Sequence, residues 1–164
     1  MSIALQYTPS NPFQAPMPSA IQKQFFDGVL ESSLGDECSA EVLKSVHQQA
    51  YESITMHREA KIPETLTMDR NSIEKMLYVA GVSPEKVNDA GDAFEAAYGA
   101  DASVPVENLL DTKHFVIKAD AYVIKGPVDM AQEICTKTIG GIPYICVPAN
   151  CGAEINGVQI VLAE

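Results

Sequence analysis

Hydrophobic residues recur at three- and four-residue intervals through residues 19–98, as they do on one face of an amphipathic helix. Residues that begin or end helices divide this pattern into segments. A first helix is expected from the capping residue Ser19 to Gly35, and a second from Ser39 to about Ala60. Their apolar stripes are Ile21, Phe25, Val29 and Leu30, then Val42, Leu43, Val46, Ala50, Tyr51 and Ile54.

Two further helices are expected before the pattern changes. The third begins at Thr67 and ends at Gly81. The fourth begins at Pro84, because a serine before a proline supplies a capping side chain and then a residue whose fixed φ suits the first turn. Gly99 ends this helix, and a connecting loop with one helical turn at 106–110 follows.

The apolar spacing changes to two from Lys113, which is the period of a β-strand. Phe115 and Ile117 lie on one face of this first strand, and residues 122–124 continue it or begin another. Strands that follow a run of helices indicate an α+β protein. The predicted fold is therefore about four N-terminal amphipathic helices packed on a C-terminal antiparallel β meander of about four strands.

Two dipeptides that accept positive φ predict tight hairpins in the meander. Each lies between runs rich in β-branched residues, at 140–141 (Gly-Gly) and 156–157 (Asn-Gly). A two-residue loop fixes the register, so Cys135 is expected opposite Cys146, and Ala153 opposite Ile160. The second hairpin should then carry one apolar face, packed on the rest of the protein.

The chain of 164 residues suits one domain or two small ones with a shared core. Prolines at 9, 12, 16 and 18 predict that residues 1–18 form an extended linker or arm. Residues 19–112 form the predicted helical region and residues 113–164 the antiparallel β region, and we expect these two regions to share one core.

The net charge of −11 is concentrated in the helical part. Residues 1–112 hold 7 Lys and Arg against 17 Asp and Glu, whereas residues 113–164 hold 4 against 5. Such an acidic surface repels phosphate backbones, so no nucleic-acid partner is expected. No apolar run approaches ~20 residues, so no membrane partner is expected. With no secretory signal visible, the default location is the cytoplasm.

Four cysteines in a chain without a signal peptide indicate free thiols in a reducing compartment. Directly opposed strand residues approach to ~5.5 Å between Cα atoms, so Cys135 and Cys146 are within disulfide range. Two small buried apolar side chains are the alternative. His114 could complete a zinc site with these thiols, although the cysteine spacing fits poorly. The candidate binding residues are Cys135, Cys146, Cys151 and His114.

The other reactive side chains form no catalytic constellation, and no metal site or cofactor is predicted. His57 lies near a helix end, where a cationic group interacts favourably with the helix dipole. Asp89, Asp92 and Glu95 recur at three-residue spacing, which is typical of the solvated face of an amphipathic helix.

Several motifs are spread over the helical and β regions: Phe115-Val-Ile-Lys118, Val123-Ile-Lys125, Glu133, Gly141, Tyr144-Ile-Cys-Val-Pro148-Ala149, Gly152-Ala-Glu154-Ile155-Asn156-Gly157, Leu66-Thr67-Met68-Asp69 and Gly81-Val82-Ser83-Pro84-Glu85-Lys86. Together they resemble an uncharacterised bacterial family, domain-of-unknown-function family 4317. The resemblance covers roughly residues 25–160, and its most specific portion is 144–157. Family members are usually much longer, so the resemblance implies that this chain is the C-terminal half of a larger bacterial cytoplasmic protein. The family tends to have acidic residues where Asn150 and Cys151 stand, and it implies no functional residue.

The sequence therefore favours a non-enzymatic interaction or regulatory module. Its partner would be another protein or a second copy, bound through an exposed sheet edge. The alternative is a small enzyme or a metal or thiol sensor that uses the Cys135, Cys146 and Cys151 cluster. In a third hypothesis, the active site lies in the absent N-terminal half and this part only supports it.

Overall fold

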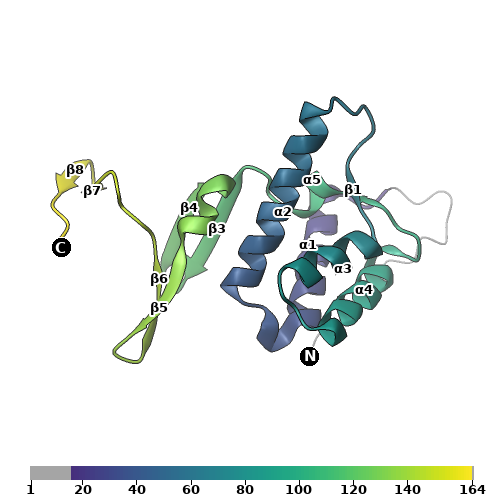
Figure 1. Cartoon of the computed structure of the whole chain (residues 1–164), viewed down its shortest axis with the longest axis horizontal. Coiled ribbons are helices and arrows are strands. Elements are labelled where there is room, and N and C mark those ends of the chain that lie inside the picture. Colours follow the sequence, from purple (N-terminus) through teal and green to yellow (C-terminus); the bar gives the residue numbers. More distant parts are fainter. Residues whose placement is uncertain (1–15, 164) are drawn as a thin grey trace.

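The computed structural model describes residues 16–163, and it shows helices followed by antiparallel strand pairs (Figure 1). The α+β fold class predicted from the sequence is confirmed. Most of the predicted N-terminal arm, residues 1–15, lies outside the described residues. The helices are α1 (Ser19–Leu34), α2 (Ala40–Glu59), α3 (Arg70–Val79), α4 (Pro84–Tyr98) and the short α5 (Val106–Leu109).

The strands form antiparallel pairs. A short pair, β1 with β2, lies within the helical region, and three hairpins follow it. The 3₁₀ helix η1 (Gly35–Glu37) links α1 to α2, and η2 (Val128–Glu133) separates the first two hairpins. The strands are β1 (Thr67–Met68), β2 (Val104–Pro105), β3 (His114–Ala119), β4 (Tyr122–Pro127), β5 (Cys135–Ile139), β6 (Ile142–Cys146), β7 (Ala153–Ile155) and β8 (Val158–Ile160).

Helix boundaries follow local capping chemistry, with three differences from the prediction. The Ser39 hydroxyl accepts a hydrogen bond from the Val42 N–H at 3.2 Å, so this cap is confirmed. Ser19 instead lies inside α1, after Pro18. Helix α3 begins at Arg70, because Asp69 provides the cap and Thr67 pairs in a strand. Ser83 precedes α4, but its hydroxyl and N–H donate to the Glu37 carboxylate rather than capping the helix.

The hydrophobic core is built from the five helices and the β1–β2 pair. Its largest side chains, among them Phe26, Leu34, Leu77 and Phe94, are fully buried. The contiguous cluster runs from Phe26 to Leu110, so each helix contributes its apolar stripe to the same interior. The expected division of the chain into residues 19–112 and 113–164 around one shared core stays a prediction.

The three C-terminal hairpins do not join into one sheet, contrary to the expected four-stranded meander. Each pairs only with itself among the described residues, although the predicted registers, including Cys135 with Cys146 and Ala153 with Ile160, are confirmed. Helix η2 separates the first two hairpins, and a non-strand segment that contains Pro148 separates the last two. Tight turns fix pairing within a hairpin, but they do not determine which hairpins pair with each other.

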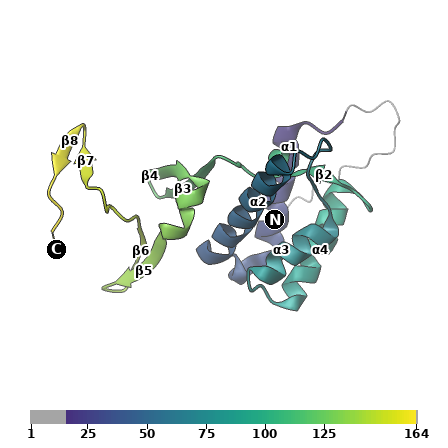
Figure 2. The ribbon, with the colours of Figure 1, turned by 45° about the horizontal axis from the view of Figure 1, so that its top comes forward.

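The last hairpin does not bury the apolar face that the sequence predicted. Ile155 and Val158 are 60% and 67% exposed. In both ribbon views the C-terminal hairpins extend away from the helices, with β7 and β8 farthest from them (Figures 1 and 2). The expectation that helices cover this face is therefore wrong for the described residues.

The hairpin region is attached to the helices along one side of α2. The Lys44 ammonium donates to the Ile134 carbonyl at 2.7 Å, and the Gln132 amide donates to the Lys44 carbonyl at 3.3 Å. One turn along α2, the His47 ring meets Phe115 of β3 edge-to-face, with ring centroids 5.3 Å apart. A small, partly polar contact therefore joins the two regions.

Candidate functional site

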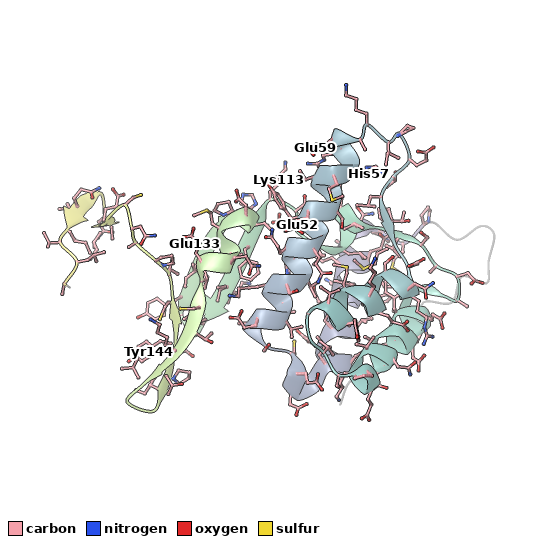
Figure 3. The ribbon with its side chains drawn as sticks, in the orientation of Figure 1. Glu52, His57, Glu59, Lys113, Glu133 and Tyr144 are labelled. Carbon is pink, nitrogen blue, oxygen red and sulfur yellow. The ribbon has the colours of Figure 1, made fainter. Side chains whose placement is uncertain are left out.

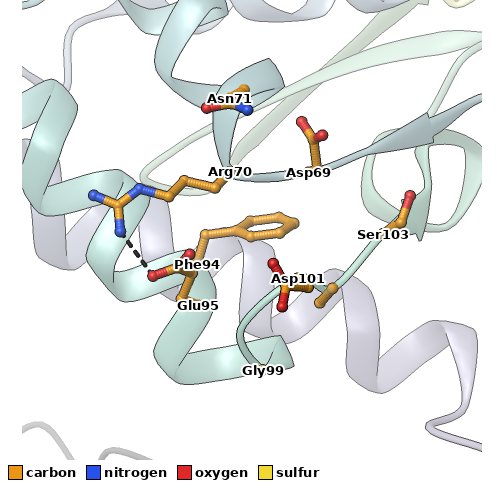
Figure 4. Close-up of a pocket in the computed structure, with 9 residues that line it drawn as sticks. Asp69, Arg70, Asn71, Phe94, Glu95, Gly99, Asp101 and Ser103 are labelled. Carbon is orange, nitrogen blue, oxygen red and sulfur yellow. Dashed lines mark hydrogen bonds and ion pairs between the residues drawn. The ribbon is translucent and has the colours of Figure 1, made fainter.

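A shallow pocket of about 290 Å³ lies where the start of α3 meets the end of α4 (Figure 4). The loop after α4 closes its third side. Its lining combines carboxylates, one guanidinium and the edge of an aromatic ring. The lining residues are Asp69, Arg70, Asn71, Phe94, Glu95, Gly99, Asp101, Ala102 and Ser103.

Arg70 is the centre of charge in this pocket. Its guanidinium pairs with Glu74 at 2.8 Å, with Asp92 at 2.7 Å and with Glu95 at 2.7 Å. Hydrogen bonds from Arg70 to Glu95, Glu74 and Asp92 raise the pKa of its guanidinium above its usual range. Asp89 and Asp92 are exposed, as expected for a solvated face, whereas Glu95 is partly buried. Asp92 and Glu95 nevertheless both pair with Arg70.

This ion cluster was missed in the sequence, although one signal pointed to it. Arg70 occupies the first position of α3, where the helix dipole disfavours a positive charge. An arginine at that position is stabilised by acidic neighbours, and two of them, Asp92 and Glu95, lie on α4. Gly91 lets the helices approach, because a Cβ at that position would collide with the Glu74 carboxylate.

The remaining groups of the pocket serve local structure. Asp69 accepts hydrogen bonds from the Ser72 hydroxyl at 2.6 Å and the Ser72 N–H at 2.8 Å. These two bonds lower the pKa of the Asp69 carboxyl. The Ser103 hydroxyl donates to the Thr67 hydroxyl at 2.6 Å, and Glu95 is paired with Arg70. In the hydrogen bonds of the described residues, no nucleophile of this lining is bonded to a base. The pocket is therefore explained by helix capping and helix packing.

The candidate thiols lie along the second hairpin and just beyond it. Cys135 and Cys146 are opposite each other and half-buried, Cys151 is exposed, and all three are free. His114 lies at the first position of β3, with Nδ1 3.5 Å from a carboxylate oxygen of Asp111. The structure therefore brings Cys135 and Cys146 together. Within residues 16–163, no three His, Cys, Asp or Glu side chains gather in a way that could hold a metal ion.

The fourth cysteine and two of the histidines belong to the helical region. Burial, followed by the nearby Glu31 charge, raises the pKa of the Cys38 thiol. Burial also lowers the pKa of His47, whose Nδ1 lies 2.8 Å from the Leu43 carbonyl oxygen. His57 lies in the last turn of α2, as the sequence predicted. Neither histidine is hydrogen-bonded to a cysteine or serine side chain in the described part of the chain.

Exposed apolar side chains distinguish the hairpin region from the helices. In the helical region, four large apolar side chains are exposed: Met56, Ile62, Tyr78 and Val79. Figure 3 shows Tyr144 on the second hairpin, away from the helices. The exposed set in the hairpin region is Val116, Tyr122, Val123, Met130, Ile139, Ile142, Tyr144, Val147, Ile155, Val158, Ile160, Val161 and Leu162.

A comparison with protein families finds one match that covers most of the chain. A family model described as a domain of unknown function (DUF4317) matches residues 12–158. The chain belongs to the DUF4317 family. The match includes all five helices and runs through β7 to the start of β8, so the helices and hairpins described above are parts of the DUF4317 domain.

The other comparisons add no second relative to the DUF4317 assignment. No curated protein and no solved structure matches the chain. In the described part of this DUF4317 domain, none of the helices combines the length and the apolar content needed to cross a bilayer.

Proposed function

We propose that this chain is a non-enzymatic protein-interaction module whose binding surface is formed by its C-terminal hairpins. The observation that carries this proposal is the set of large apolar side chains left exposed on β3 to β8. An isolated two-stranded hairpin is at best marginally stable in water. A partner that covers these side chains would bury apolar surface and stabilise the hairpins at once.

The charge distribution supports this placement of the binding surface. The hairpin region is almost neutral, whereas the helical region carries nearly all of the net negative charge. A partner approaching the hairpins avoids most of that charge, since exposed charges are screened beyond about 10 Å at 0.1 M salt. Four free thiols support placing the module in a reducing compartment such as the bacterial cytoplasm.

Matched apolar-to-polar variants test the proposal. The hairpin variant combines Ile142→Thr and Val158→Thr, which retain β-branched residues at exposed strand positions. The control variant combines Met56→Gln and Val79→Thr, at exposed positions of α2 and α3. Size-exclusion chromatography with light scattering measures binding to a second copy. Binding to other proteins is measured by quantitative capture from lysate, with the captured proteins identified by mass spectrometry. The measurement is then repeated with the purified partner. Binding that the hairpin variant loses and the control keeps supports the proposal; equal binding by both, or none, overturns it.

The register of the second hairpin supports a second candidate function, thiol-based sensing. Cys135 and Cys146 are directly paired, a separation of ~5.5 Å between Cα atoms for a hydrogen-bonded pair. A two-electron oxidant such as diamide would then remove two protons and two electrons from the pair and form the disulfide. Mass spectrometry should show a Cys135–Cys146 link. Elemental analysis of the purified protein tests whether it holds a metal, for which Cys151 and His114 are the further candidate ligands. Oxidation that joins other cysteines, together with protein free of metal, removes this candidate.

A further inference from the structure

The second hairpin has an open edge along β5. Its tight turn makes Ile139–Ile142 the first hydrogen-bonded pair, so pairing alternates from there along both strands. Thr136 and Thr138 consequently direct their N–H and C=O groups outward. Both residues are exposed, and no other strand pairs with β5 among residues 16–163.

The other boundaries of this hairpin are less accessible to a further strand. On β6, the outward positions are Pro143, which has no N–H to offer, and the half-buried Ile145. Before β5, the Ile134 N–H donates to the Ala131 carbonyl, and the Ile134 carbonyl accepts from the Lys44 ammonium. The open edge is therefore short, from Thr136 to Thr138, with Lys137 at its centre.

Lys137 argues against a second copy on this edge. The two-fold antiparallel register that satisfies Thr136 and Thr138 of both copies places Lys137 opposite its own equivalent. Like charges directly opposite each other destabilise a strand pair, whereas opposite charges stabilise it. Lysine on an edge strand is also a common means of preventing self-pairing. The edge thus favours a different strand with a carboxylate at the central position.

The side chains on the same face as Lys137 indicate which other residues the partner strand should carry. Ile139, Ile142 and Tyr144 lie on this face and are 58%, 57% and 45% exposed. We propose that the β5 edge binds an extended segment of a partner protein, with an Asp or Glu opposite Lys137 and apolar residues two positions to either side. This inference rests on the proposed interaction function and specifies its partner.

Two synthetic peptides test the proposed pairing. One is the capped peptide Gly-Val-Thr-Glu-Thr-Val-Gly, and the other has Lys in place of Glu. Titration of the ¹⁵N-labelled full chain should shift the Thr136 and Thr138 amide signals, with the Glu peptide binding about two- to five-fold tighter than the Lys peptide. Lys137→Glu should reverse this preference. Lys118→Glu, at an exposed position of β3, should leave it unchanged.

A backbone variant tests the edge itself. Thr138→Pro removes an outward N–H and leaves the hairpin bonds in place, as Pro143 does on the opposite strand. This variant should keep the remaining amide spectrum and lose peptide binding. Equal affinity for the two peptides, or no shift at Thr136 and Thr138 at millimolar peptide, overturns the proposal. These outcomes leave the capture experiment with Ile142→Thr and Val158→Thr untouched, so the two proposals fail separately.

Discussion

The helical region and the hairpin region are stabilised by different kinds of contact. The helices bury their apolar stripes against one another, and the nine largest fully buried side chains include only one, Val128, from beyond residue 110. The hairpins are held by turn geometry and by a contact with α2. The helical region therefore buries one contiguous apolar cluster, whereas the hairpin region exposes many of its large apolar side chains.

The largest expected effect distinguishes these two regions directly. Phe94→Ala removes a fully buried ring from the helical core and should lower the free energy of unfolding by about 3–5 kcal/mol. Ile142→Thr, at an exposed position of β6, should change it by less than about 0.5 kcal/mol. Denaturant unfolding followed by circular dichroism at a helical wavelength measures both. A comparable loss from the two variants would mean that the hairpin is part of the cooperative core.

The difference between the regions also explains which features the sequence could predict. The registers of the second and third hairpins were predictable because they depend on local turn residues: Gly140, Gly141, Asn156 and Gly157 all adopt positive φ. The start of α4 was predictable from Pro84 for the same local reason. The assembly of hairpins was not, because apolar residues on both faces of the second hairpin specify no particular neighbour.

Long-range electrostatic contacts were the other feature of the structure that could not be predicted from the sequence. Asp92 and Glu95 have the spacing of a solvated face, and only the approach of α3 brings Arg70 to them. Lys44 is similar, because its buried ammonium binds a carbonyl 90 residues away in the chain. The opposition of Cys135 and Cys146 could be predicted from the turn, whereas the open edge of β5 required knowing that no other strand in residues 16–163 covers it.

The next largest effect concerns the junction between the two regions. Lys44→Met retains the aliphatic stem but leaves the Ile134 carbonyl without its donor, which costs about 1–3 kcal/mol. Hydrogen exchange should accelerate in η2 and at the start of β5, with α4 unchanged. Lys23→Met serves as the control, because its ion pair with Asp27 is half exposed and contributes little. Equal protection in the two variants would contradict the role of Lys44 in the junction.

A smaller effect should appear at the same junction as the pH falls. His47 has a lowered pKa in the folded chain, so the unfolded chain binds more protons once the pH drops below about 6.5. The stability that neutral His47 contributes is therefore fully present above about pH 6.5. It is lost as the pH falls toward the pKa of His47 in the folded chain. The groups facing His47 include Lys23, Asp27 and Asp111. Denaturant midpoints between about pH 7 and pH 5.5 should fall less steeply for His47→Gln than for wild type or His57→Gln; parallel curves would contradict this role.

The smallest expected effect tests the contact between α3 and α4 inside the helical region. Gly91→Ala should gain about 1 kcal/mol from helix propensity, but its methyl group displaces the Glu74 carboxylate that pairs with Arg70. In wild type these effects oppose each other, so the change in unfolding free energy should be small. In a Glu74→Ala background the collision with the carboxylate is gone, and the Arg70 side chain, whose Nε lies 3.0 Å from the ideal Cβ, no longer has its Glu74 partner. The same substitution should then stabilise the chain. A double-mutant cycle measures the difference. If Ala at position 91 has the same effect in both backgrounds, Gly91 is not kept small by the Glu74 carboxylate, and the helices approach there for another reason.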